Sequence, residues 1–301
     1  MAATECTTSD RNVPAQSLAP AKINLFLHVG PRQADGYHPI SSLMIFANIG
    51  DELGLTPGAP MGLTVEGPFG ASLSDGGDNL VLRARDLFLD RFGRAFAPFG
   101  LTLDKRLPIA AGLGGGSADA AATLQLLARH HGVDSSHPSL DVMARALGAD
   151  VAACFAGRTV VAEGRGDELT PAPLMPALDA VLVNPGAPSS TAAVYGAFDD
   201  LPAGPGADRP ALPPGLPTAR RAAEVFNRLR NDLEAPALVL QPLIGEALRA
   251  LADQPETLLA RMSGSGATSF ALVETPADAR RLAARFAEAH PTWWVRPCRL
   301  G

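Results

Sequence analysis

Residues 108–119 read PIAAGLGGGSAD, and four of the five positions from Gly112 to Gly116 are glycine. Glycine adopts backbone angles that other residues avoid, at a cost in unfolded-chain entropy. The stretch follows a predicted strand at residues 100–109 and precedes an alanine-rich helix. Ser117 is the candidate N-cap of that helix, and Gly132 is its predicted end. Such a turn either packs tightly or leaves room for a ligand to approach the backbone.

The residue order of this turn excludes two common nucleotide-binding loops. A P-loop ends in Gly-Lys followed by Ser or Thr, and the sequence contains no Gly-Lys pair. The dinucleotide-binding fingerprint needs a glycine where Ser117 stands. What remains is a strand, a loop without side chains and the free N–H groups of a helix start, which favour a bound phosphate. The alternative is a tight turn onto a helix of small residues.

The composition is that of an ordinary globular protein, with 301 residues, of which 47% are hydrophobic and 19% charged. A net charge of -6 argues against a nucleic-acid or anionic-membrane partner. No apolar run reaches the ~20 residues that cross a bilayer. Residues 1–17 are polar, and we expect a disordered tail without a secretion signal. Three scattered cysteines indicate a reducing, cytoplasmic setting.

Two polar positions stand out against this background. Residues 21–29, AKINLFLHV, alternate as a strand does, so Lys22 and Asn24 should share one face at a spacing of about 7 Å. Lys22 is one of only two lysines among the 25 basic residues, although a solvated strand end would also explain it. Asp150 precedes the apolar run VAACFAG and is either a helix cap or a reactive carboxylate.

The order of predicted elements indicates an α+β protein of two domains. A helix after the N-cap Asp78, strands near 178–186 and 293–298, and helices near 219–232 and 237–253 are expected. Thr275 to Asp278 form a capping box with proline at the first helical position. We expect the tail at 1–17, an N-terminal domain at 18–170, and a C-terminal domain at 171–301 with a Pro-rich insert near 201–218.

Three segments resemble, in order, the signature segments of the GHMP small-molecule kinases: APAKINLFLHV (19–29), LPIAAGLGGGSADAAATL (107–124) and RMSGSGATSF (261–270). Shorter stretches narrow the resemblance to the GHMP kinases that act on a CDP-linked sugar alcohol: ADGYH (34–38), DNLVLRA (78–84), DKRLP (104–108), LGADV (147–151), VNPG (183–186) and RNDLE (230–234). Two positions depart from the pattern, with Ala152 where proline is usual and Asp119 where asparagine is common.

The resemblance implies an N-terminal domain like domain 2 of ribosomal protein S5 and a ferredoxin-like C-terminal domain, with the active site between them. It implies transfer of the γ-phosphate of ATP to the 2-hydroxyl of a CDP-linked methylerythritol in the non-mevalonate isoprenoid pathway. Mg²⁺ is expected with ATP, without assigned ligands, and no oligomeric state is predicted. Lys22 and Asp150 take the catalytic positions: Asp150 can accept the hydroxyl proton, and Lys22 can stabilise negative charge.

The remaining site residues also follow from the resemblance. The predicted ATP-binding residues are Pro108, Ile109, Ala110, Ala111, Gly112, Leu113, Gly114, Gly115, Gly116, Ser117, Ala118, Asn79 and Lys105, the last two at the adenine pocket. The predicted substrate-binding residues are Asn24, Tyr37, His38 and Tyr195. A cytosine ring would stack between Tyr37 and Tyr195 with His38 at its edge. Without the resemblance, an exposed Tyr-His pair is an ordinary surface feature.

Three other functions compete with this interpretation. A GHMP kinase acting on homoserine or mevalonate fits the general signatures, but ADGYH and RNDLE argue against it. A non-catalytic nucleotide-binding module would not need both Lys22 and Asp150. RNA binding is suggested only by the expected S5-like fold, and the acidic charge opposes it.

Overall fold

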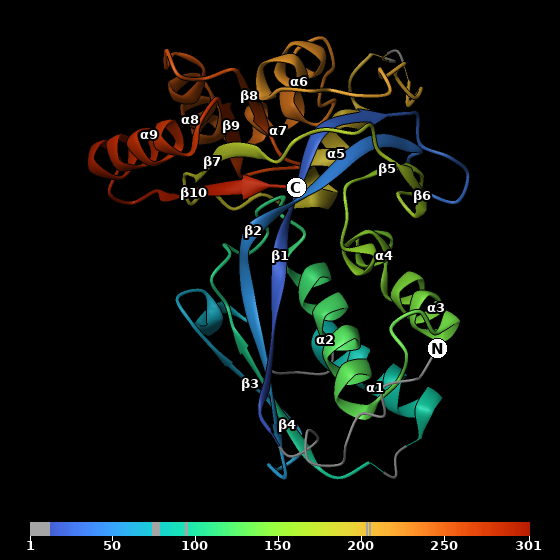
Figure 1. Ribbon diagram of the computed structural model, residues 1–301. Coiled ribbons are helices and arrows are strands. Elements are labelled where there is room, and N and C mark those ends of the chain that lie inside the picture. Colours follow the sequence, from blue (N-terminus) through green and yellow to red (C-terminus); the bar gives the residue numbers. More distant parts are fainter. Residues whose placement is uncertain (1–12, 74–78, 94–95, 203, 205) are drawn as a thin grey trace. The chain divides into compact units, whose positions relative to one another are not determined.

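The computed structural model describes residues 13–73, 79–93, 96–202, 204 and 206–301 (Figure 1). The chain forms two compact units that are interleaved in sequence. Unit 1 comprises Gly50–Leu107, Gly115–Ala156 and the described residues before Ala21; unit 2 comprises Ala21–Ile49, Pro108–Gly114 and Gly157–Gly301. A single cut near residue 170 does not reproduce these units, because the long strands β1 (Ala15–Val29) and β2 (Ile40–Pro57) contribute to both.

The sheet of unit 1 is built around β4 (Phe99–Asp104). β4 pairs antiparallel with the end of β2 and parallel with β3 (Gly62–Glu66), while β2 also pairs with β1. Residues alternate between buried and half-buried along β4, so that Phe99, Leu101 and Leu103 supply one apolar face. A short 3-10 helix at Gly70–Ser72 follows β3.

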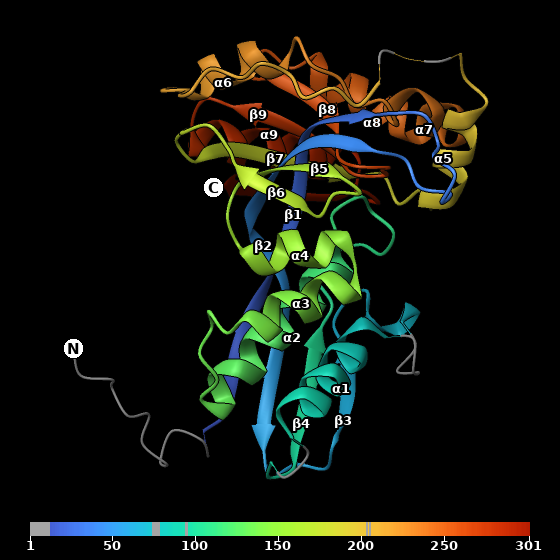
Figure 2. The same cartoon turned by 90° about the vertical axis from the view of Figure 1, so that its right-hand side faces the viewer.

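The helices of unit 1 gather on one side of this sheet, as Figure 2 shows. They are α1 (Leu80–Phe92), α2 (Gly115–His131), α3 (Pro138–Leu147) and α4 (Ala149–Ala156). α2 contacts the other three helices and is buried along most of its length. Its run of small residues, Ala120–Ala122, lets neighbouring helices approach closely, so the start of α2 is held by a packed core.

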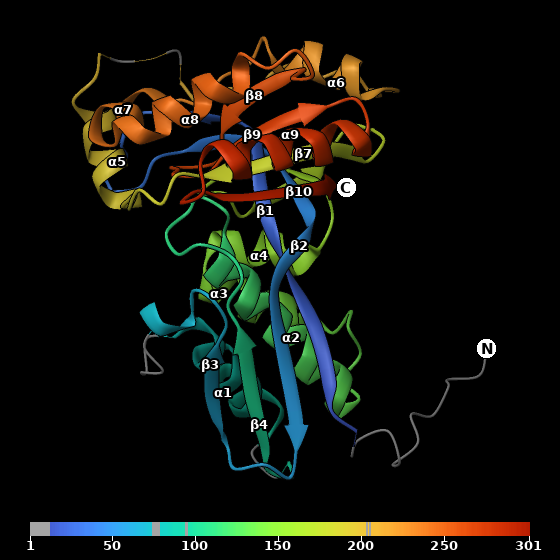
Figure 3. The same ribbon diagram turned by 90° about the vertical axis from the view of Figure 1, so that its left-hand side faces the viewer.

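Unit 2 contains an antiparallel sheet with two covering helices (Figure 3). Its strands follow the order β10 (Trp294–Leu300), β7 (Leu178–Asn184), β9 (Ser269–Val273) and β8 (Leu259–Met262). Helices α8 (Pro242–Ala252) and α9 (Pro276–Ala289) pack on it. Their shared core is Val181, Val183, Leu251, Ala271, Leu282 and Phe286.

A second group of elements in unit 2 surrounds the ends of β1 and β2. β5 (Val160–Gly164) pairs with the first residues of β2 and with β6 (Glu168–Pro171). Helices α5 (Thr191–Asp199), α6 (Ala219–Phe226) and α7 (Glu234–Leu240) complete the unit. One apolar cluster joins β1 to α5, α7 and α8: Leu27, Val29, Val194, Leu233, Ala237 and Ile244.

The α+β class and the order of most elements agree with the expectation from the sequence. The capping box is confirmed, since the side chain of Thr275 accepts a hydrogen bond from the backbone N–H of Asp278 at 3.2 Å. Residues 201–218, as far as the structure describes them, contain no helix and no strand beyond an isolated bridge at Gly215. Among the described residues, no helix has the length and apolar character needed to span a membrane.

The predicted N-terminal tail is too long. β1 begins at Ala15, so residues 15–17 belong to a strand, while residues 1–12 lie outside the described residues. These first strand residues alternate between half-buried and exposed, and their polar composition conceals the strand. Asp78, the predicted N-cap of the next helix, also lies outside the described residues. The N-cap of α1 is Asn79, whose side-chain oxygen accepts from the N–H of Val81 at 2.9 Å.

Three further helix predictions are wrong at their ends. α2 begins at Gly115, so Ser117 lies in its first turn and is not the N-cap; Gly112 and Gly114, with φ of 72° and 63°, form the turn itself. The helix expected at 237–253 is two helices, because Pro242 has no N–H to donate and disfavours helical angles at Gln241. The helix expected at 219–232 already ends at Phe226.

Candidate active site

The first half of the glycine turn, Pro108–Gly114, belongs to unit 2 and packs on a second glycine-rich turn. The carbonyl of Gly112 accepts from Ser263 Oγ at 2.9 Å, and that of Ala111 accepts from the N–H of Thr268 at 3.0 Å. A Cβ atom at Gly112 would lie 2.2 Å from the carbonyl oxygen of Ser263. Glycine is therefore required at 112 by the contact between two backbones, as the tight-turn alternative proposed.

The second half of the turn opens helix α2 in unit 1. The first N–H groups of a helix lack partners within it, and the helix dipole adds partial positive charge there. Gly115 and Gly116 place no side chain around these donors, and at Gly116 an added Cβ would meet only Leu80, at 3.7 Å. The geometry of this helix start therefore suits an anion.

A buried polar chain holds Lys22 in unit 2. Its Nζ donates to Asn24 Oδ1 at 2.9 Å, and Asn24 Nδ2 donates to Ser42 Oγ at 2.7 Å. The exposed fractions of Lys22 and Asn24 are 5% and 2%, so Lys22 is not a solvated strand end. The prediction that both side chains share one face of β1 is confirmed. The backbone of Lys22 also donates to the carbonyl of Leu113, which ties β1 to the glycine turn.

Ser42 and Ser263 were not predicted from the sequence. Ser42 lies on β2, and Ser263 Oγ accepts from the backbone N–H of Asn24 at 3.2 Å. Both serines contact β1 only after the strands and turns have assembled, so no local pattern marks them. The signature RMSGSGATSF, which contains Ser263, was the only signal that pointed to one of them.

Asp150 is half-buried in the first turn of α4, in unit 1. Gly148 precedes this helix, and its carbonyl accepts from the N–H groups of Val151 and Ala152. Asp150 is therefore the second residue of α4 and not the residue that caps it. Because Lys22 belongs to unit 2 and Asp150 to unit 1, the pairing of these two residues stays a prediction.

Lys105, a predicted contact of the adenine, lies in a buried group of charges, and its contact with the adenine stays a prediction. Its Nζ lies 2.5 Å from Asp51 Oδ2 and 2.7 Å from Asp119 Oδ2, and only 3% of the residue is exposed. The other oxygen of Asp51 accepts from the backbone N–H groups of Arg106 and Leu107, which ends β4 at Asp104 instead of residue 109. The Lys105 ammonium thus pairs with two carboxylates, and it lies next to Gly115, where an added Cβ would be 3.1 Å from Nζ.

The charges of this triad shift the pKa values of Lys105 and Asp119. Burial acts to lower the pKa of Lys105, but the charges of Asp119 and Asp51 outweigh it and raise this pKa. Burial, together with the charge of Asp51, raises the pKa of Asp119 to about 7, although Lys105 opposes the shift. One lysine facing two buried carboxylates therefore favours a proton on Asp119.

Apart from Asn24, the predicted substrate residues of unit 2 form two groups. Tyr37 is 56% exposed, and the guanidinium carbon of Arg165 lies 4.2 Å from its ring centroid. Asp35 forms an ion pair with Arg165 and accepts from the N–H of Tyr37 at 3.0 Å. The sequence did not mark Arg165 or Asp35, because the three residues meet only when β5 pairs with β2.

His38 and Tyr195 form the second group. Their ring centroids are 4.9 Å apart, and Phe198 meets the His38 ring edge-on at 5.8 Å. His38 Nε2 lies 2.6 Å from Asp199 Oδ1, a partner that the sequence did not identify. The structure thus brings Tyr195 against His38, and the expected stacking of a base between Tyr37 and Tyr195 stays a prediction.

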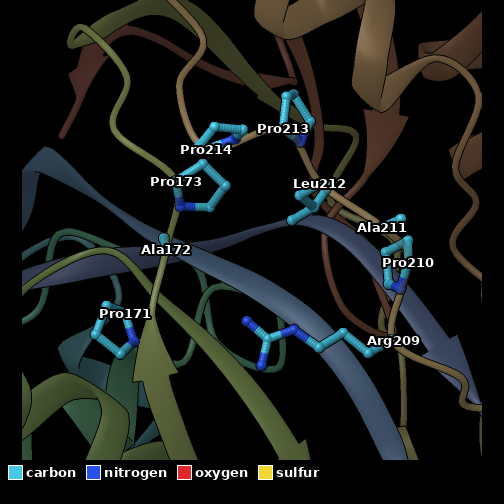
Figure 4. Close-up of a pocket in the computed structure, with 9 residues that line it drawn as sticks. All are labelled: Pro171, Ala172, Pro173, Arg209, Pro210, Ala211, Leu212, Pro213 and Pro214. Atoms are coloured by element: carbon cyan, nitrogen blue, oxygen red, sulfur yellow. The ribbon is translucent and has the colours of Figure 1, made fainter.

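A pocket of about 510 Å³ lies in unit 2, lined by residues 171–173 and 209–214 (Figure 4). Five of its nine residues are prolines, and Arg209 at its edge forms an ion pair with Glu163. It contains none of the predicted catalytic or substrate residues, so the candidate active site is not this pocket.

Comparison with known proteins identifies the class. The profile of the GHMP kinases N terminal domain matches residues 79–158, and that of the GHMP kinases C terminal domain matches residues 214–292. The chain belongs to the GHMP kinase family. Homoserine kinase from Cytophaga hutchinsonii shares the fold, with a TM-score of 0.68 and 20% identity over 99% of this chain and 97% of that chain.

Within the family, one kind of kinase is much more similar. A protein of Caulobacter vibrioides named 4-diphosphocytidyl-2-C-methyl-D-erythritol kinase is 53% identical over 94% of this chain and 98% of its own length. The kinase of the same name from Methylorubrum extorquens is 47% identical over 94% and 97% of the two chains. A crystal structure of 4-(cytidine 5'-diphospho)-2C-methyl-D-erythritol kinase has a TM-score of 0.75 and 35% identity, covering 95% and 99%.

Proposed function

We propose that this chain transfers the γ-phosphate of ATP to the 2-hydroxyl of 4-diphosphocytidyl-2-C-methyl-D-erythritol, in the non-mevalonate route to isoprenoid precursors. The observation that carries the proposal is the 53% identity over 94% of the chain to a kinase of that name. The buried chain from Lys22 through Asn24 to Ser42 supports it, because these hydrogen bonds hold in place the lysine that would stabilise negative charge during the transfer.

Each group of predicted site residues would have a separate role in phosphoryl transfer. The N–H groups from Gly112 to Ser117 would hold the phosphates, since this reaction depends on positioning and charge stabilisation. Asp150 would accept the proton of the substrate hydroxyl, and Lys22 would offset the negative charge at the reacting centre. Tyr37, His38 and Tyr195 would bind the cytosine. Asn79 and Lys105, which also support α1 and the start of α2, would line the adenine pocket.

Mg²⁺ would enter with ATP. Among the described residues, no group of three or more His, Cys, Asp or Glu side chains could hold a metal ion. This fits Mg²⁺, which ATP sites bind through substrate phosphates, waters and one or two carboxylates. When bound, the ion would neutralise charge on the phosphates. The cytoplasmic setting and the absence of nucleic-acid and membrane partners stay predictions.

An assay of ADP release tests the function. The purified chain would be given ATP and Mg²⁺ with 4-diphosphocytidyl-2-C-methyl-D-erythritol, homoserine or mevalonate in separate reactions. We expect ADP release only with the CDP-linked alcohol. Release with homoserine or mevalonate alone would assign the chain to another GHMP kinase activity, and no release with any alcohol would contradict a kinase.

A further inference from the structure

The pair formed by His38 and Asp199 has a chemical consequence beyond its geometry. Asp199 is the last residue of α5, and His38 lies in the loop before β2. The His38 side chain is only 7% exposed, while that of Asp199 is 31% exposed. The tilted ring contact with Tyr195, at an interplanar angle of 37°, and the edge contact with Phe198 hold the plane of the imidazole, and Asp199 meets it at Nε2.

An ionised carboxylate can accept hydrogen bonds but not donate them. The 2.6 Å contact between Asp199 Oδ1 and His38 Nε2 therefore places a proton on Nε2. A neutral imidazole carries one such proton, so its other nitrogen, Nδ1, is left as an acceptor. Asp199 thus selects one of the two tautomers of His38.

The selected tautomer can distinguish two pyrimidines. Cytosine presents an amino group at position 4, which donates, whereas uracil presents a carbonyl oxygen there, which accepts. An unprotonated Nδ1 would pair with the amino group of cytosine and would face the lone pairs of the uracil oxygen. We infer that Asp199 is a positioning residue that holds His38 in the Nε2–H tautomer and thereby makes the kinase select a cytosine over a uracil diphosphate alcohol. This inference rests on the proposed function, in which His38 meets the edge of the base.

The variant Asp199→Leu tests the inference, because leucine has a similar volume and cannot accept a hydrogen bond. The kcat/KM of each variant would be measured with the CDP-linked alcohol and with the UDP-linked alcohol that differs only in the base. Asp199→Leu should lower the ratio of the two kcat/KM values about tenfold or more, which is the effect of about one hydrogen bond. The KM for ATP should stay within about twofold, which also shows that the variant is folded.

Two further variants sharpen this measurement. Asp200→Asn changes the same charge at the next residue, and the ratio should match that of the unchanged chain. Asp199→Asn keeps an oxygen that can accept from Nε2, so it should restore part of the selectivity that leucine removes. If Asp199→Leu leaves the ratio within about twofold of the unchanged chain, Asp199 only joins α5 to the preceding loop and the inference is wrong.

A spectroscopic measurement separates this inference from the proposed function. In the full chain labelled with ¹⁵N-histidine, two-bond ¹H–¹⁵N spectra report the tautomer, and His38→Gln identifies the His38 signals. Neutral His38 should carry its proton on Nε2, and Asp199→Leu should populate the Nδ1–H form. A proton on Nδ1 of the unchanged chain would overturn the inference even if the kinase assay succeeds. If that assay shows no ADP release with any alcohol, the proposed function is wrong. The spectra would still decide separately whether Asp199 sets the tautomer of His38.

Discussion

Asn24 Oδ1 accepts a hydrogen bond from Lys22 Nζ at 2.9 Å, and the neighbouring strand fixes the direction of this bond. Ser42 Oγ donates to the carbonyl of Phe26 at 2.6 Å, so its oxygen is left to accept from Asn24 Nδ2 at 2.7 Å. With its NH₂ group directed there, Asn24 presents its oxygen to Lys22. Ser42 therefore positions Lys22 through Asn24.

Ser42→Ala should lower kcat about tenfold and destabilise the fold by about 1–3 kcal/mol, because Asn24 loses the acceptor of its buried NH₂ group. Ser41→Ala is the matched control: Ser41 is equally buried on the same strand, and its Oγ has no hydrogen-bond partner among the described residues. Its free energy of unfolding and its kcat should match or exceed those of the unchanged chain. Equal losses in both variants, measured by urea unfolding and steady-state kinetics, would rule out the positioning role.

The alternation of residues 21–29 was enough to predict that Lys22 and Asn24 share a face, because the side-chain period of a strand is a local property. The partners of Asn24 could not be predicted in this way. Ser42 and Ser263 are 18 and 239 residues away in sequence, and their contacts depend on strand register and on the packing of two turns. The contact between Asp51 and Lys105 could not be predicted for the same reason, because the two residues are 54 positions apart in sequence.

The glycine turn shows a second feature that could be predicted only in part from the sequence. Four glycines predicted a turn before a helix, and the structure confirms it. The sequence analysis, however, weighed tight packing against ligand binding for the turn as a whole and not for each glycine. Gly112 is needed for the contact with Ser263, whereas Gly115 lies over the Lys105 ammonium. Spacing alone cannot separate these reasons, because they depend on which atoms lie beyond each missing Cβ.

Asp150→Asn should reduce kcat by about 10²–10⁴-fold, the usual contribution of a positioned general base, while ATP still binds. Asparagine keeps the size of the side chain but is a much weaker base. Asp141→Asn, at an exposed helical aspartate of the same unit, serves as the control and should retain nearly full activity. Isothermal calorimetry with ATP and single-turnover kinetics would check both points. A near-normal rate of the chemical step in Asp150→Asn would show that another group takes the proton.

Gly115→Ala and Gly116→Ala should have different effects on stability. A Cβ at 115 would lie 3.1 Å from Lys105 Nζ and 3.5 Å from Asp51 Oδ2, which disturbs the buried triad. At 116 the contact with Leu80 at 3.7 Å is an ordinary one, and alanine is favoured over glycine in helices by up to about 1 kcal/mol. Urea unfolding should therefore show a loss at 115 and no loss at 116.

The Gly116 position also tests phosphate binding in a folded protein. Gly116→Val should weaken the affinity for ATP, because a β-branched side chain would crowd the N–H donors at the start of α2. Calorimetry that finds the same ATP affinity in this variant as in the unchanged chain would leave the turn with a packing role alone.

Asp119→Asn should stabilise the protein at pH 8 more than at pH 5. The pKa of Asp119, raised to about 7 by burial and by Asp51, exceeds the value of about 4 in an unfolded chain. Between these values the folded state binds more protons, so stability falls as the pH rises from about 4 to about 7 and stays low above it. The asparagine of the variant could still accept from Lys105 but would not need to be ionised.

The comparison with the unchanged chain would use urea unfolding at both pH values. The gain at pH 8 should exceed that at pH 5 by on the order of 1 kcal/mol or more. Asp104→Asn, a change at a more exposed carboxylate next to Lys105, should show no comparable difference between the two pH values. A gain from Asp119→Asn that is equal at pH 5 and pH 8 would mean that Asp119 is ionised throughout this range.

Tyr37→Ala should raise the KM for the CDP-linked alcohol about tenfold and leave that for ATP little changed. Arg165 lies over the Tyr37 ring at 4.2 Å and is held there by Asp35, so one face of the ring is already covered. A cytosine would then use the other face, where stacking on an aromatic side chain contributes about 1–3 kcal/mol. Tyr37→Phe keeps the ring and should keep most of the affinity. Steady-state kinetics with each substrate varied in turn would test this: equal rises in both KM values would indicate general damage, and no rise in either would remove Tyr37 from the site.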